Sequence, residues 1–289
     1  TAHRFLLQTK LDRFFPTSSL AFSFHSGAAL YSHYPAENKL INEATCNYTL
    51  KLHPLAVLGW RTFGRYKYFF RREIDYFLGY STPYFRLNID QHNAVESGFL
   101  YERLNYTRAN NYDFAGSSLF FRYTHRFSSS MTLFCRYRYG CYHYNRMANT
   151  LYPEMTDPLP QKDTIRHLAA GADFIWMGIL VNGSVHFECN RSNSYGFEFR
   201  RHYVNLICAR TFRSFLVRGY VMWQNKKYLD EFLPTWPIEL DSEREHSNFI
   251  VVDISRDVAP SVTALFRFAR YKNESPWPRL YYKKNLINI

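Results

Sequence analysis

The chain has 289 residues, of which 46% are hydrophobic and 19% aromatic, and a formal charge of +12 from 36 Lys and Arg against 24 Asp and Glu. This length suits a single domain over residues 1–289. Its basic residues are spread through strand-like segments and form no block, recognition helix or zinc motif, which argues against nucleic acid as a partner. No apolar run approaches the roughly 18 residues that a transmembrane helix needs.

A two-residue alternation recurs along the chain and is clearest at residues 181–190. Val185 and Phe187 share one face there, and Ser184 and His186 share the other, which is the period of a β-strand. The 24 Tyr and 26 Phe add the rings that form girdles at both lipid boundaries of membrane barrels. The pattern predicts a transmembrane β-barrel; a soluble all-β sandwich or barrel with an aromatic core is the alternative.

The first half of the chain divides into alternating segments separated by turn signals. Residues 67–83 hold a basic pair and Pro83, and we expect a long loop there. Pro54 fits a tight turn, because a turn needs no ladder donor. The predicted strands cover about 3–14, 20–31, 43–53, 55–66, 84–89, 94–106, 117–127 and 131–144.

The second half continues in the same way around two long loops. Residues 145–163 contain three prolines and residues 229–245 are acidic, and both compositions indicate loops. The predicted strands cover about 165–176, 179–190, 195–212, 215–228, 248–258, 262–272 and a terminal strand from 280.

The predicted connections alternate between short and long. The short ones lie at 15–18, 53–54, 128–130, 213–214 and 259–260, and the long ones at 32–42, 67–83, 145–163 and 229–245. Bacterial barrels place short turns in the periplasm and long loops outside, with an even number of strands. About fifteen strands are counted, so we expect an antiparallel up-and-down β-barrel of 14–16 strands.

Basic side chains recur on the water-facing side of these strands. Such residues would bias a lumen toward anionic solutes, anionic polymers or lipopolysaccharide phosphates. The alternative is that they pair with inward acids, such as Glu188 or Glu198, and stiffen the wall. The predicted lumen residues are Arg122, Arg126, Arg136, Arg138, Arg218, Lys226 and Arg267.

The five cysteines form no CxxC pair, haem-attachment motif or metal-ligand spacing. They fall in register with apolar neighbours, and we interpret them as small apolar side chains in hydrocarbon. No metal and no cofactor is expected. The predicted lipid-facing residues are Cys46, Cys135, Cys141, Cys189, Cys208, Val185, Phe187 and Val221.

The last third of the chain carries segments with a family resemblance. They are DSEREH at 241–246, ISRD at 254–257, APSV at 259–262, RYKNES at 270–275 and RLYY at 279–282. This part resembles the C-terminal barrels of tetratricopeptide-repeat-linked outer-membrane proteins, which include surface lipoprotein assembly modifiers and some exopolysaccharide exporters. The resemblance implies an outer-membrane channel or export pore with a periplasmic helical-repeat partner. The chain has no such repeats and stops at Ile289 without a terminal aromatic residue, so both a separate barrel subunit and an excised domain stay open.

These observations favour a multi-pass protein of the bacterial outer membrane, in contact with lipid and lipopolysaccharide, that acts as a channel or as an export or secretion conduit. The alternative is a structural barrel that sheathes a partner, such as an electron-carrying cytochrome or an exported polymer, or that anchors a surface partner. We expect no enzyme, since the candidate bases His143 and His186 have no sequence-evident nucleophile. A mitochondrial barrel is a further alternative, which the long and short connections disfavour.

Overall fold

The computed structural model describes residues 2–31, 35–71, 74–108, 110–150, 159–230, 248–259, 262–273 and 282–288. These residues form fifteen β-strands and two 3₁₀ turns, η1 (Pro35–Glu37) and η2 (Asn110–Tyr112). The strands are β1 (Ala2–Phe14), β2 (Ser18–Tyr31), β3 (Lys39–His53), β4 (Ala56–Phe69), β5 (Tyr76–Asn88), β6 (Asn93–Tyr106), β7 (Phe114–Ser128), β8 (Met131–Met147), β9 (Pro160–Trp176), β10 (Ile179–Ser192), β11 (Phe199–Phe212), β12 (Phe215–Tyr228), β13 (Asn248–Ala259), β14 (Val262–Asn273) and β15 (Tyr282–Asn288).

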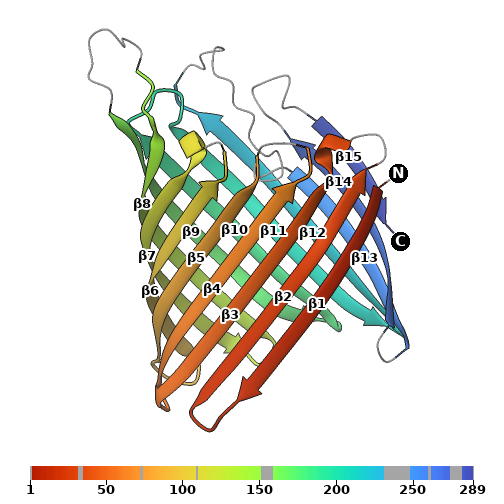
Figure 1. Cartoon of the computed structure of the whole chain (residues 1–289). Coiled ribbons are helices and arrows are strands. Elements are labelled where there is room, and N and C mark those ends of the chain that lie inside the picture. Colours follow the sequence, from red (N-terminus) through yellow and green to blue (C-terminus); the bar gives the residue numbers. More distant parts are fainter. Residues whose placement is uncertain are drawn as a thin grey trace. The chain divides into compact units, whose positions relative to one another are not determined.

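Every strand is hydrogen-bonded to its neighbours in the chain, so the order in the sheet runs from β1 to β15. The ladders whose register is described are all antiparallel. Figure 1 shows β1 to β4 as long ribbons lying side by side. The predicted all-β, antiparallel, up-and-down fold of 14–16 strands is confirmed, with the fifteen described strands in one sheet. Among the described residues, no helix has the length and hydropathy to span a membrane.

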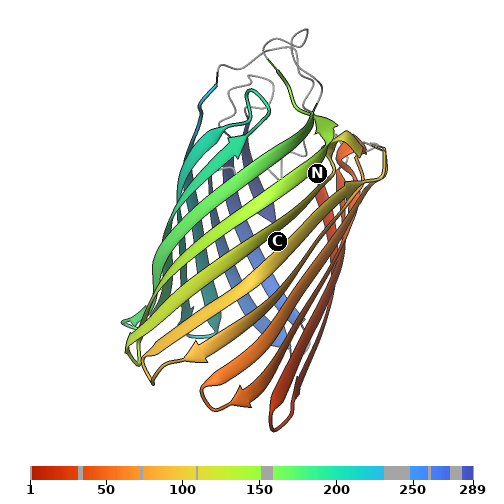
Figure 2. The same ribbon diagram turned by 90° about the vertical axis from the view of Figure 1, so that its left-hand side faces the viewer.

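The connections alternate between short and long, as predicted. The short ones span 15–17, 54–55, 89–92, 129–130, 177–178, 213–214 and 260–261, and the long ones 32–38, 70–75, 107–113, 148–159, 193–198, 229–247 and 274–281. In Figure 2 the turns of the red β1–β2 hairpin and the orange β3–β4 hairpin lie at the same end.

The long loop predicted over residues 67–83 is wrong, because β4 continues to Phe69 and β5 already begins at Tyr76. Pro83 lies within β5 and pairs with Trp60 of β4. On the β6 side, the paired residues skip from Ser81 to Tyr84. A proline removes one ladder donor. Here the pairing is interrupted only toward β6, while the pairing with β4 continues through Pro83.

The two faces of the strands differ in the way a membrane barrel requires. On β7, Leu119 is 64% exposed and Phe121 48%, whereas the alternate residues Ser118 and Phe120 are each 3% exposed. One face thus exposes large apolar side chains. The other, here called the polar face, carries buried and half-buried polar side chains together with some aromatic and aliphatic ones. A soluble sandwich packs the apolar faces of two sheets against each other. The described strands instead form one sheet with exposed apolar side chains, which disfavours the soluble alternative.

Contacts divide the described chain into two compact units. The first contains residues 1–123, 137–166 and 190–198, and the second contains 124–136, 167–189 and 199–289. In the first unit a buried cluster on β5–β8 lies opposite the exposed apolar face and consists of Tyr76, Leu104, Tyr106, Phe114 and Tyr142. The second unit carries the polar groups described next.

Candidate functional site

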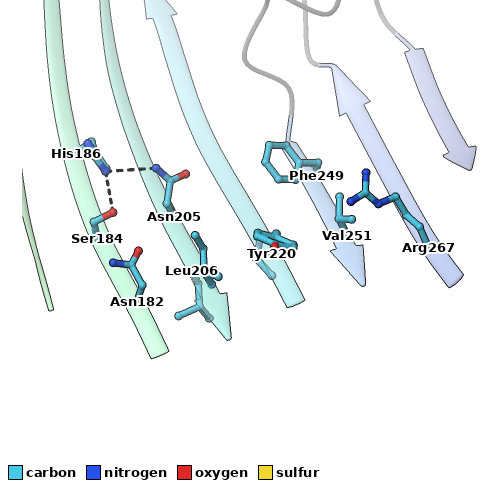
Figure 3. A pocket seen from close by; sticks show the side chains of 11 residues that line it. Asn182, Ser184, His186, Asn205, Leu206, Tyr220, Phe249, Val251 and Arg267 are labelled. Carbon is cyan, nitrogen blue, oxygen red and sulfur yellow. Dashed lines mark hydrogen bonds between the residues drawn. The ribbon is translucent and has the colours of Figure 1, made fainter. Parts of the chain in front are cut away.

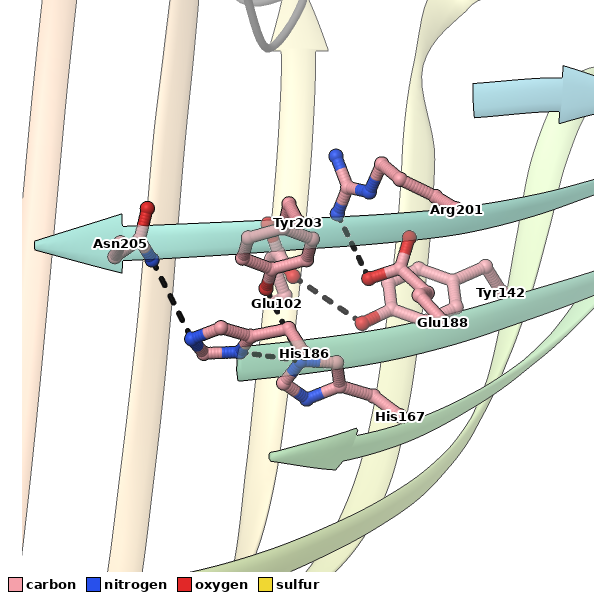
Figure 4. Close-up of polar contacts among 8 residues, drawn as sticks. All are labelled: Glu102, Tyr142, His167, His186, Glu188, Arg201, Tyr203 and Asn205. Carbon is pink, nitrogen blue, oxygen red and sulfur yellow. Dashed lines mark hydrogen bonds and ion pairs between the residues drawn. The ribbon is translucent and has the colours of Figure 1, made fainter. Parts of the chain in front are cut away.

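A chain of hydrogen-bonded polar side chains lies on the polar face of β9, β10 and β11, in the second unit (Figure 4). His186 Nδ1 lies 3.0 Å from His167 Nε2, and the Tyr203 hydroxyl also lies 3.0 Å from that nitrogen. The rings of His186 and Tyr203 stack at 4.1 Å between centroids. Alternate residues of a strand share one face, which is why Ser184 joins the same group.

The neighbours of His186 fix its tautomer. Asn205 Nδ2 lies 3.4 Å from His186 Nε2, and Ser184 Oγ lies 2.9 Å from it. An amide nitrogen can only donate, so Nε2 accepts and the proton resides on Nδ1. His186 then donates to His167, and the Ser184 hydroxyl donates to His186.

A buried ion pair lies beside this chain. Arg201 Nη2 donates to Glu188 Oε2 at 2.9 Å, and both residues are buried. The Arg201 guanidinium also lies over the Tyr203 ring, 4.7 Å from its centre. The expectation that Glu188 pairs with an inward arginine agrees with this contact, although Arg201 was not among the predicted lumen residues.

A second charged cluster joins β12, β13 and β14. The register places Arg218 opposite Asp253 and Asp253 opposite Arg267. Asp253 is completely buried and accepts two bonds from Arg267, at 2.6 Å and 2.7 Å, while Arg218 Nη2 lies 3.7 Å from its Oδ2. Two guanidinium groups share one carboxylate, so the cluster has a formal charge of +1.

A cavity of about 470 Å³ lies between these two groups of residues, within the second unit. Figure 3 shows its side chains in sequence across the strands: polar groups on β10, Asn205 and Leu206 on β11, aromatic and aliphatic groups on β12 and β13, and Arg267 on β14. The lining residues include Asn182, Ser184, His186, Asn205, Tyr220, Phe249, Val251 and Arg267. Its size lies in the usual range of small-molecule sites.

The structure places the remaining predicted basic residues as follows. Arg122, Arg136 and Arg138 are half-buried on the polar face of β7 and β8, and Arg126 is exposed near the turn that joins these strands. Lys226 is exposed near the end of β12 and donates to the Tyr228 hydroxyl at 2.6 Å. Of the predicted set, Arg218 and Arg267 share a described ion-pair partner.

Sequence reasoning missed the ion pairs of Arg61 and Arg65 in the first unit. Arg61 bonds Glu96 through both of its terminal nitrogens, each at 3.1 Å, and Arg65 Nε donates to Glu43 at 2.6 Å. Arg61 and Glu96 lie on β4 and β6, and the Arg61 guanidinium crosses the ring of Tyr84 on β5 at 4.0 Å. The alternation places all of these side chains on one face, but only the strand register could have paired them.

The predicted lipid-facing residues lie among the exposed apolar side chains or beside them. All five cysteines are free; Cys135 is exposed, and Cys46, Cys141, Cys189 and Cys208 are of intermediate exposure. Val185 is 57% exposed, Phe187 38% and Val221 37%. Within the described part of the chain, no group of three His, Cys, Asp or Glu side chains could hold a metal ion.

Comparisons with known proteins identify structures but no family. No protein-family model and no curated protein matches the chain. Among solved structures, it is similar to the TodX monoaromatic hydrocarbon channel (a deltaS2 mutant), with a TM-score of 0.47 and 9% identity over 93% of this chain and 85% of that one. It is also similar to the β domain of the Bordetella autotransporter BrkA, with a TM-score of 0.25 and 7% identity over 78% of this chain and 92% of that one.

Proposed function

We propose that this chain is an integral β-barrel of the bacterial outer membrane that acts as a channel or export conduit with a basic lumen. One observation carries the proposal: where side chains are described, the strands expose large apolar side chains on one face, and the other face holds hydrogen-bonded polar and charged side chains. Hydrocarbon can solvate only the first face, and water or a polar solute suits the second.

The sign of the charge supports a preference for anions. The chain carries a formal charge of +12, and the Asp253 cluster combines two arginines with one carboxylate. A lumen lined by excess positive charge attracts anions and repels cations. The ion pairs Arg61–Glu96, Arg65–Glu43 and Arg201–Glu188 contribute no net charge and would stiffen the wall.

The family resemblance refines the proposal. A barrel of the tetratricopeptide-repeat-linked type would work with a periplasmic helical-repeat partner, and the short connections would then face that partner. A second candidate function is a barrel that sheathes or anchors a partner protein. The buried cluster around Tyr76 and Tyr106 favours it, since inward aromatic groups narrow the free lumen.

Planar-bilayer recording of the refolded protein tests the proposal. We expect stable current steps whose reversal potential in a salt gradient shows anion preference, and we expect Arg136→Glu with Arg138→Glu to reduce that preference. Currents that are equally selective in this double variant would contradict the role of these arginines. A folded barrel that carries no current would contradict the open conduit and favour the sheathing function.

A further inference from the structure

We infer that the cavity on β10–β14 binds a hydroxylated ring that carries a carboxylate, the chemistry shared by sugar acids and hydroxylated aromatic acids. The inference deepens the proposed function and rests on it, because a solute reaches the polar face only through a water-filled lumen. Three groups of side chains, arranged in the order of the strands, support it (Figure 3).

The middle of the cavity offers flat and apolar surfaces. Tyr220 on β12 pairs with Val251 on β13, and the next inward pair along these strands is Met222 with Phe249. Tyr220, Val251 and Phe249 all line the cavity. Aromatic and aliphatic side chains pack against the face of a ring, whether the ring is aromatic or belongs to a sugar.

One end of the cavity offers neutral hydrogen-bonding groups. Asn205 uses its amide nitrogen toward His186 at 3.4 Å, and its amide oxygen has no hydrogen-bond partner among the described residues. Asn182 donates through its amide nitrogen to Asp173, and Ser184 uses its proton toward His186. What these three side chains present to the cavity is mainly acceptor oxygens, which suit the O–H groups of a ligand.

The other end offers positive charge and a spare donor. Arg267 lines the cavity and uses Nε and Nη2 for Asp253, and its Nη1 has no partner in the described part of the chain. Arg218 does not line the cavity, but its charge adds to that of the cluster. A carboxylate at this end would balance the formal charge of the cluster and accept from Arg267 Nη1.

The cavity has room for one small ligand. Asn205 and Arg267 both line it, and its volume of about 470 Å³ can accommodate a substituted ring.

Calorimetric titration of the refolded protein in detergent tests the inference with two pairs of compounds. Glucuronate is compared with glucose, which lacks the carboxylate, and 3,4-dihydroxybenzoate is compared with benzoate, which lacks the hydroxyl groups. We expect at least one acid that bears hydroxyl groups to bind about tenfold more tightly than its partner compound. The acid that binds more tightly shows whether the natural ligand is a sugar acid or a hydroxylated aromatic acid. Equal affinities within both pairs, or no binding by any of the four, would overturn the inference.

Three variants locate the binding. Asn205→Ala should weaken binding of the hydroxylated acid about tenfold, and Arg267→Gln should weaken it by a similar factor through the carboxylate. Asn225→Ala is the matched control, since this exposed side chain follows Gln224 on β12 and belongs to the opposite face. Equal loss in all three variants would overturn the inference.

The calorimetric result is independent of conductance. Binding by a barrel that carries no current would support the site while contradicting the conduit. Currents without binding of any of the four compounds would support the conduit while contradicting the site.

Discussion

Asp253 is the shared counter-ion of the two arginines on β12 and β14. It is completely buried, and removing it would leave Arg218 and Arg267 facing each other without a counter-ion. Breaking a buried pair from one side costs 3–5 kcal/mol, and because both arginines are about one-third exposed we expect Asp253→Ala to lower the free energy of unfolding by about 2 kcal/mol. Urea unfolding of the refolded barrel measures this change.

Asp12 provides the control for this prediction. Its ion pair with Lys10 spans 2.8 Å between exposed side chains, and exposed pairs contribute at most about 1 kcal/mol. Asp12→Ala should therefore leave the unfolding midpoint nearly unchanged. If the two variants lose the same stability, the Asp253 cluster has no special structural role.

A pH-dependent contact occurs in the short turn between β5 and β6. The Asp90 carboxylate accepts bonds from the side chain of Asn93 and from the backbone N–H groups of His92 and Asn93, and these bonds lower its pKa below the usual value. A lowered pKa means that the contact stabilises the turn above the unfolded-state pKa and is lost as pH falls through the folded-state value.

Amide hydrogen exchange at His92 and Asn93 checks this expectation. Correcting for the intrinsic pH dependence of exchange, we expect protection of both amides at neutral pH and its loss in acid. Asp90→Asn should remove the charge and make protection independent of pH. Protection in the parent protein that stays the same from neutral to strongly acidic pH would contradict the role of the carboxylate.

At the scale of the strands, close contact between β4 and β5 depends on a missing side chain. A Cβ atom at Gly59 would lie 2.0 Å from Cζ of Tyr84, and the same ring supports the Arg61 guanidinium. Gly59→Ala should displace the Tyr84 ring and cost about 1–3 kcal/mol, as overpacking does.

Gly219→Ala is the comparison for this variant, because a Cβ atom at Gly219 would have no heavy atom within 4 Å. Its stability should equal or slightly exceed that of the parent, since alanine restricts the unfolded chain. Thermal unfolding of both variants, followed by the shift of the folded band on gels, gives the comparison. Equal effects would mean that Tyr84 moves aside without cost.

The alternation predicted most strands because it follows directly from which side chains meet lipid. It failed at residues 67–83, where Pro83 and the basic pair Arg71-Arg72 indicated a loop by composition. The structure instead continues β5 through Pro83 and pairs it with Trp60. Composition reports the average preference of a segment, whereas one missing donor is tolerated when the neighbouring ladder holds the strand.

At the scale of the whole molecule, a charged residue on the apolar face should cost more stability deep in the bilayer than near its surface. Val185 lies in the middle of β10, and Val258 lies near the end of β13, with 57% and 60% exposure. A charge on the lipid face costs about 2–4 kcal/mol at the bilayer midplane and about 0–1 near its surface. We therefore expect Val185→Arg to destabilise the protein in lipid far more than Val258→Arg. Unfolding in vesicles measures both, and equal costs would contradict the proposed orientation in the membrane.

The candidate site was less predictable than the fold. Periodicity correctly indicates which face a residue occupies, so Arg218 and Arg267 could be assigned to the polar face. Their common partner Asp253 could not be found, because it depends on the registers of β12, β13 and β14. The cavity itself also depends on five strands in register, and no single segment carries a signal for it.

The most direct test of membrane embedding uses the native thiols. Cys135 is an exposed side chain in the isolated chain, so a water-facing Cys135 would react readily with a charged maleimide. If the apolar face lies in lipid, this thiol should resist the reagent in sealed vesicles and react once the protein is unfolded in detergent. Rapid labelling of Cys135 in intact vesicles would contradict the account, because it would place the apolar face of β8 in water.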